Sequence, residues 1–169
     1  MRVIAALSIV LTMLCSFVTT TGETQSNELI NTTKEYPTAF VIRENPMAFE
    51  SLNEVYHTLL LTACENNMDQ AYKEWQRVLY SFNTFAKQNQ VDLEGVKMWI
   101  KIFWSKDGYV EHIAYDLKPQ SKKIKKKELT KLIEQFIASY QEPVTSYEDQ
   151  FSHYGSVAYP FNKTAIHAD

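Results

Sequence analysis

Apolar residues recur with helical spacing in two neighbouring segments of the N-terminal half of the chain. In residues 52–63 they return every three or four positions, and Pro46 suits the first turn of a helix that leads into them. In residues 68–85 the same spacing gives a stripe rich in aromatic side chains, which we interpret as core packing rather than as a ligand pocket. Because only residues 65–67 interrupt the pattern, we predict an antiparallel pair of helices.

The spacing changes to a period of two over residues 96–104, which predicts a β-strand. One face of this strand is apolar throughout, whereas the other face mixes cations with aromatic rings. The mixed face consists of Lys97, Trp99, Lys101 and Phe103. A turn at residues 105–108 and a second strand at residues 109–117 complete a hairpin. The apolar positions shift phase near Glu111 and His112, where we expect a β-bulge.

The C-terminal part adds one more helix and one more strand. Helical spacing returns over residues 129–140 and Pro143 ends it, and residues 157–161 alternate as a last strand. A further short strand is expected at residues 39–42. The order predicts an α+β fold, in which a helical hairpin is followed by a β-hairpin, a helix and a strand. We expect one domain over residues 46–169, with helices packed on a small antiparallel sheet.

The first 22 residues have the pattern of an export signal. A mostly apolar run of sixteen residues, 3–18, follows Arg2 and is shorter than the ~20 residues that span a bilayer, and small residues precede Glu23. We predict cleavage before Glu23, and a protein that is periplasmic or secreted. The alternative is an uncleaved signal anchor. Residues 23–45 are polar and are expected to form a tail or linker.

Composition excludes several chemistries. The net charge is −3, and the four glycines are too scattered for a P-loop or a dinucleotide-binding loop. Once Cys15 leaves with the signal, Cys64 is the remaining thiol, which we expect to be a small core residue. The histidines lack metal-ligand spacing, so no metal, cofactor or catalytic site is predicted, and a hydrolase without a recognisable motif is the least favoured function. These histidines are His57, His112, His153 and His167.

A run of lysines stands out from the otherwise acidic chain. Between Lys118 and Lys131 there are seven lysines and one acidic residue, Glu128. The centre of the run consists of Lys122, Lys123, Lys125, Lys126 and Lys127. Two interpretations stay open: a docking patch for an anionic lipid or another polyanion, or a solvated segment that pairs with acidic residues of the same protein. Export makes nucleic acid an unfavoured partner.

The hairpin has a form known from one family. Gly95 precedes the alternating strand, Lys106, Asp107 and Gly108 form the turn, and the second strand carries offset apolar residues. Residues 94–119 therefore resemble the hairpin of the TonB-type C-terminal domain, the periplasmic end of energy transducers. The helix and last strand that follow fit the same family, so the resemblance covers roughly half of the mature chain.

The resemblance implies a fold and a mode of binding, in which a partner strand is added at a sheet edge. The Pro-rich linker and the Pro-Gly element of energy transducers are missing, so we do not carry over energy transduction. We expect a non-enzymatic, exported binding module that acts on an envelope protein. Its binding surface would be a sheet edge or the face that carries Trp99 and Phe103, and the alternative is anionic binding through the lysine run.

Overall fold

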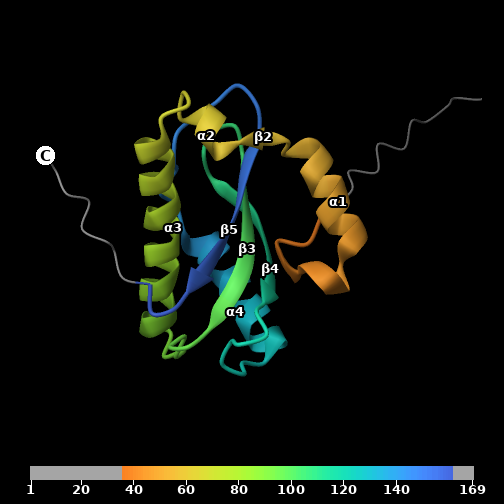
Figure 1. Cartoon of the computed structure of the whole chain (residues 1–169), viewed down its shortest axis with the longest axis vertical. Coiled ribbons are helices and arrows are strands. Elements are labelled where there is room, and N and C mark those ends of the chain that lie inside the picture. The colour runs from red at the N-terminus through yellow and green to blue at the C-terminus, as the bar shows by residue number, and fades with distance from the viewer. Residues whose placement is uncertain (1–35, 162–169) are drawn as a thin grey trace, which may run out of the picture. The chain divides into compact units, whose positions relative to one another are not determined.

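The computed structural model describes residues 36–161, so the predicted signal peptide and most of the predicted polar tail lie outside the described residues. Five strands and four α-helices confirm the α+β fold (Figure 1). In chain order the elements are β1 (Ala39–Val41), the 3-10 helix η1 (Ile42–Glu44), α1 (Pro46–Val55), β2 (Thr58–Leu59), α2 (Leu60–Ala63), α3 (Met68–Gln88), β3 (Lys97–Trp104), β4 (Val110–Leu117), α4 (Lys126–Ser139) and β5 (Phe151–Ala158).

The strands form a single mixed sheet in the order β1-β4-β3-β5-β2. The central strand β3 is antiparallel to both β4 and β5, as the sequence predicts for this part. The two outermost strands are short and run parallel to their neighbours, β1 to β4 and β2 to β5. The sheet is therefore mixed rather than wholly antiparallel, because both outermost strands come from short stretches before the hairpin.

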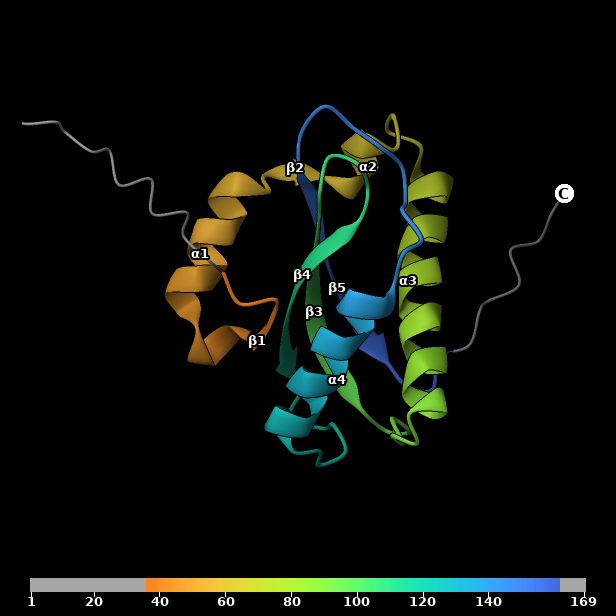
Figure 2. The ribbon, with the colours of Figure 1, turned by 180° about the vertical axis from the view of Figure 1, so that it is seen from behind.

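The helices cover both faces of the sheet. Helices α3 and α4 pack on one face, and α1 lies on the other, so that α1 and α3 are separated by the sheet (Figures 1 and 2). This differs from the predicted antiparallel pair of helices. The chain leaves α1 at Tyr56, runs along β5 as β2, and only then enters α2 and α3. The apolar residues of the first segment thus serve two different cores.

The main core lies between the sheet and the pair α3 and α4. The apolar face of β3, including Met98, Ile100 and Ile102, is buried there against the stripes of both helices. The stripe of α4 contributes Leu132 and Phe136, as its spacing predicts. The smaller cluster on the other face joins α1 to the sheet through Leu52 and Phe103, among others.

The predicted turn and bulge of the hairpin are both present. Phe103 pairs with His112 and Trp104 pairs with Val110, so Glu111 is the extra residue of the bulge. Gly108 has a φ of +85°, and a Cβ added there would lie 2.5 Å from the carbonyl oxygen of Thr145. The turn therefore requires glycine both for its backbone conformation and for the close approach of the segment that leads to β5.

The last strand begins earlier than the sequence pattern predicts. The alternation at residues 157–161 continues back to Phe151, and Gly155 lies in the middle of the strand. A Cβ added to Gly155 would lie 2.9 Å from the Trp75 ring of α3. The glycine therefore lets α3 approach β5 closely, with the Trp75 ring lying against the strand at Gly155.

Candidate functional site: the open edge of β5

The mixed face of β3 is divided by α1 into a covered part and an open part. Lys97, Trp99, Lys101 and Phe103 lie on the face predicted for them, opposite the main core. Phe103, however, is completely buried in the cluster beneath α1. Its side chain is therefore not accessible in this structure, so binding through this face would depend on its exposed part and stays a hypothesis.

Lys101 is held within the covered part of this face. Its ammonium group donates a hydrogen bond to Asn53 Oδ1 over 2.6 Å, and it lies 5.8 Å and 5.4 Å from the ring centres of Phe49 and Phe103. Burial lowers the pKa of Lys101. Its stem packs on the aromatic rings while its charge is satisfied locally, so it offers little to a partner.

Trp99 occupies the open part. It is 41% exposed, and its ring is stacked with that of Tyr154 on β5, with ring centres 6.0 Å apart. The Lys118 ammonium lies 4.0 Å from the centre of the Trp99 ring. Trp99 and Tyr154 therefore form an exposed aromatic surface that reaches the margin of the sheet at β5.

In the part of the chain that the structure describes, the edge of β5 is open along most of its length. Strand β2 pairs only with Phe151 and Ser152, and Leu60 then begins α2. Among the residues that the structure describes, no strand pairs with residues 153–158 on the side away from β3. Such an edge is a template for a further strand.

The hydrogen-bonding groups at this edge follow from the register of β5 on β3. The Tyr159 amide donates to the Val96 carbonyl over 2.8 Å, and residues of an antiparallel strand alternate in the side to which they bond. The N–H and C=O groups of Tyr154, Ser156 and Ala158 therefore point away from β3. All three residues are exposed. These groups are positioned to bond an added strand.

An apolar cavity of about 310 Å³ opens beside this edge, where β2 ends. Its wall combines the end of β2, both helices that follow it, and β5. The lining residues are Leu59, Leu61, Met68, Ala71, Tyr72, Trp75, His153 and Tyr154. Leu59, Met68 and Tyr72 are 56%, 65% and 54% exposed, which is unusual for large apolar side chains that lie together.

The hydrophobic pattern of the sequence did not predict this cavity. Met68 and Tyr72 belong to the helical stripe that we interpreted as core, but they lie at the N-terminal end of α3, above the sheet edge, and stay exposed. Helix α3 begins at this place because Asn67 caps it, with its side chain accepting a hydrogen bond from the Gln70 amide over 3.0 Å. Which apolar residues of α3 stay exposed therefore depends on the position at which β2 ends.

His153 forms part of the inner wall of the cavity. Its ring makes an edge contact with Trp75, with ring centres 4.7 Å apart. Burial lowers the pKa of His153, and the charge of Lys101 lowers it further. Because a lowered pKa keeps the imidazole neutral at pH 7, the cavity wall carries no formal charge there.

Three of the seven lysines in the run form ion pairs with acidic groups of the same protein. Lys122 pairs with Asp92, Lys125 with Glu128 over 2.8 Å, and Lys126 with Glu44 over 2.6 Å. Lys123 and Lys127 are exposed, and Lys127 lines a groove of about 610 Å³ between α4 and β1. This groove also contains Glu44 and Glu134, so its charge is mixed.

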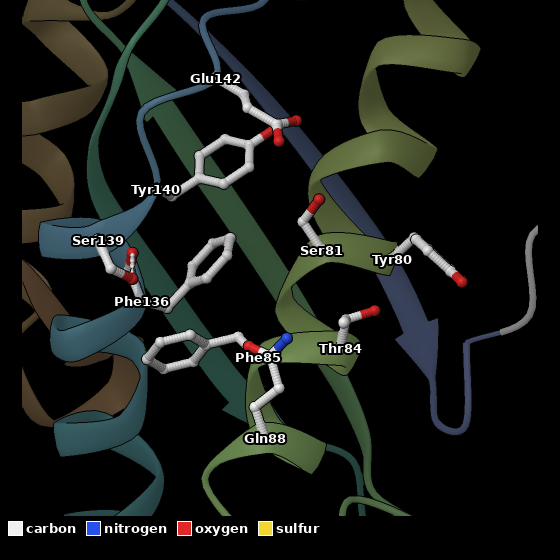
Figure 3. Close-up of a pocket in the computed structure, with 9 residues that line it drawn as sticks. All are labelled: Tyr80, Ser81, Thr84, Phe85, Gln88, Phe136, Ser139, Tyr140 and Glu142. Carbon is white, nitrogen blue, oxygen red and sulfur yellow. Dashed lines mark hydrogen bonds between the residues drawn. The ribbon is translucent and has the colours of Figure 1, made fainter.

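A cavity of about 440 Å³ lies between α3 and α4, and Figure 3 shows the side chains that line it. Its aromatic residues Phe85, Phe136 and Tyr140 are packed on one another, with ring centres 5.7 Å and 4.9 Å apart. Hydroxyl and amide groups of Ser81, Thr84 and Gln88, all on α3, are also drawn there.

No protein-family model matches this sequence, and neither characterised proteins nor solved structures show significant similarity to it. The resemblance of residues 94–119 to the TonB-type domain stays a prediction. Among residues 36–161, no three His, Cys, Asp or Glu side chains are grouped so as to hold a metal ion. No helix in that part of the chain is long and apolar enough to cross a membrane. Cys64 is a buried free thiol.

Proposed function

We propose that this protein is a non-enzymatic, exported interaction module of the periplasm or cell envelope. It binds an extended segment of a partner protein, which adds to the sheet along β5. The backbone groups of Tyr154 and Ser156 supply the hydrogen bonds of the added strand, and the Trp99 surface packs against it.

The observation that carries this proposal is the early end of β2. Within residues 36–161, this two-residue strand leaves residues 153–158 without a neighbouring strand on one side, directly beside exposed apolar side chains. Proteins ordinarily protect a sheet edge with charged residues, proline or a covering element. At this edge the outward-facing residues of β5 are Tyr154, Ser156 and Ala158, which have none of these protective features.

Anionic binding through the lysine run is the second candidate function. The exposed Lys123 and Lys127 support it, whereas the ion pairs of Lys122, Lys125 and Lys126 reduce the charge available to an anion. The two candidates differ in their response to salt. Strand addition depends weakly on ionic strength, whereas binding by exposed lysines weakens steeply with salt.

A display library of random ten-residue peptides, selected against the folded domain, tests strand addition. Ser156→Pro removes the outward N–H without removing a hydrogen bond to β3, and Ser156→Ala is the matched control that keeps this N–H. We expect selected peptides to bind the wild type and Ser156→Ala, and to lose most of their affinity for Ser156→Pro. The binding affinities are measured by fluorescence anisotropy.

Amide hydrogen exchange of the free protein gives an independent reading of the same edge. We expect the Tyr154 and Ser156 amides to exchange rapidly and the Gly155 and Val157 amides to be protected. Slow exchange at Tyr154 and Ser156 in the isolated monomer would contradict an open edge. Peptides that bind Ser156→Pro as well as the wild type, and only at low salt, would favour the lysine run instead.

A further inference from the structure

The cavity beside β5 gives the edge a means of selecting its partner. We infer that the bound segment carries one long aliphatic or aromatic side chain, such as Leu, Met or Phe, that enters this cavity as an anchor. This inference rests on the proposed strand addition, and it names the chemistry of the segment that is bound.

The size of the cavity suits one large side chain. An apolar protein cavity of about 150 Å³ is enough to hold a benzene molecule. The cavity beside β5 measures about 310 Å³ and is bounded on its inner side by Trp75, Ala71 and Leu61. It therefore has room for a Phe, Leu or Met side chain, and a shorter residue would leave it partly empty.

The chemistry of the wall excludes a charged anchor. No Asp, Glu, Lys or Arg lines the cavity. His153 is the titratable group of the inner wall, and the lowered pKa described above keeps it neutral. A charged side chain placed here would lose its hydration without gaining an opposite charge, which is unfavourable, whereas an apolar side chain gains by burial.

The geometry of strand addition brings one residue of the segment to the cavity. Side chains of an added strand alternate between the two faces of the sheet. Beside Tyr154, one face of the sheet is next to Trp75 and Tyr72 of α3. The other face carries the stacked rings of Tyr154 and Trp99. The residue that points toward α3 at this position is the anchor, and its two neighbours in sequence lie on the aromatic surface.

The helical walls of this cavity lie outside the hairpin that resembles the TonB-type domain. Helices α2 and α3 and strand β2 supply six of its eight lining residues, and β5 supplies the other two. Any selectivity for a partner that α2, α3 and β2 provide is therefore independent of the resemblance to that domain. We commit to an extended segment of a partner protein as the occupant, because the outward backbone groups of Tyr154 and Ser156 suit an added strand and the uncharged cavity wall suits one large apolar side chain.

The experiment uses the selected peptides and a pair of tyrosine variants on one helix. Tyr72→Ala removes an exposed wall of the cavity. Tyr80→Ala is the matched control, because Tyr80 is also exposed on α3 but lines the cavity between α3 and α4. We expect the selected sequences to share one Leu, Met or Phe, and its replacement by Ala to weaken binding about tenfold or more. Tyr72→Ala should weaken binding by a similar factor, and Tyr80→Ala by less than about twofold.

The outcomes separate this inference from the proposed function. Peptides that need the Ser156 amide but share no apolar residue, and that bind Tyr72→Ala normally, overturn the anchor and leave strand addition standing. A library without any peptide that depends on Ser156 overturns both. A wild-type protein that sediments as a dimer, with Ser156→Pro a monomer, identifies a second copy as the occupant and overturns the choice of a different protein.

Discussion

Gly155 and Trp75 show how single residues set the form of the β5 edge. A Cβ at Gly155 would collide with the indole ring, so the glycine is what allows Trp75 to lie against the strand. The same ring contacts His153 and closes the inner wall of the cavity. The apolar character of the cavity therefore depends on keeping His153 uncharged beneath Trp75.

The lowered pKa of His153 predicts a loss of stability in mild acid. The unfolded chain binds a proton on this histidine near its ordinary value of 6.5, and the folded protein does so only at lower pH. The stability that neutral His153 contributes is complete above about pH 6.5 and is lost as the pH falls through the lowered pKa. We expect urea unfolding at pH 5 to give a smaller free energy than at pH 7.5, and His153→Gln to reduce this difference.

The control for this prediction is His57→Gln, which replaces an exposed histidine between α1 and β2. Because the side chain is exposed, this substitution should change the free energy of unfolding by little. An equal pH dependence in the wild type and in His153→Gln would show that other groups, such as carboxylates, account for the acid sensitivity.

At the scale of elements, α1 decides how much of the mixed face of β3 is exposed. Leu52 and Tyr56 carry the helix onto Phe103, and the Tyr56 hydroxyl donates a 2.5 Å hydrogen bond to Glu111 Oε2. The helix therefore covers the part of this face that carries Phe103 and leaves Trp99 exposed. A segment added to β5 meets only the part that α1 leaves open.

Removal of the main apolar contact of α1 should destabilise the protein. Leu52 is completely buried, and Leu52→Ala is expected to lower the free energy of unfolding by about 2–5 kcal/mol. Met47→Ala on the same helix is the control, because Met47 is largely exposed and such changes cost within about 0.5 kcal/mol. Chemical denaturation measures both, and equal effects of the two substitutions would contradict the packing of α1 on the sheet.

At the scale of the whole molecule, the two candidate binding regions lie on different elements. The edge of β5 is apolar and lies beside α3, whereas the lysines belong to the start of α4 and the segment before it. Ion pairs link Lys126 to η1 and Lys122 to the segment before β3. Lys118 contacts the Trp99 ring of the β5 site, whereas the other lysines of the run do not line the cavity beside β5 and contribute to the surface charge and to local contacts.

Export of the whole chain is a separate prediction. Expressed at full length in a Gram-negative host, the protein should be recovered from the periplasm with an intact mass that corresponds to a start near Glu23. The mostly apolar run of residues 3–18 is long enough for a signal and short for a membrane span. A membrane-bound product of full mass would contradict cleavage and would indicate a retained signal anchor.

Local pattern was sufficient for the hairpin, its bulge and the stripe of α4. Three local features predict the hairpin: a period of two over residues 96–104, a glycine in the turn and a shift of apolar phase near Glu111. Each can be interpreted from neighbouring residues alone. The two faces of β3 could be assigned for the same reason. Their surroundings could not, because Phe103 and Trp99 have the same position in the pattern and differ only in whether α1 lies above them.

The sequence by itself therefore determined the α+β class, the alternation of β3 and the absence of glycine-rich nucleotide loops. The tertiary structure decided where the chain leaves one face of the sheet for the other, and thus which apolar residues stay exposed. A two-residue strand such as β2 has no periodicity that a sequence can display, because its pairing with Phe151 and Ser152 comes from a segment more than ninety residues away. The open edge and its cavity follow from that pairing and from the point at which it stops.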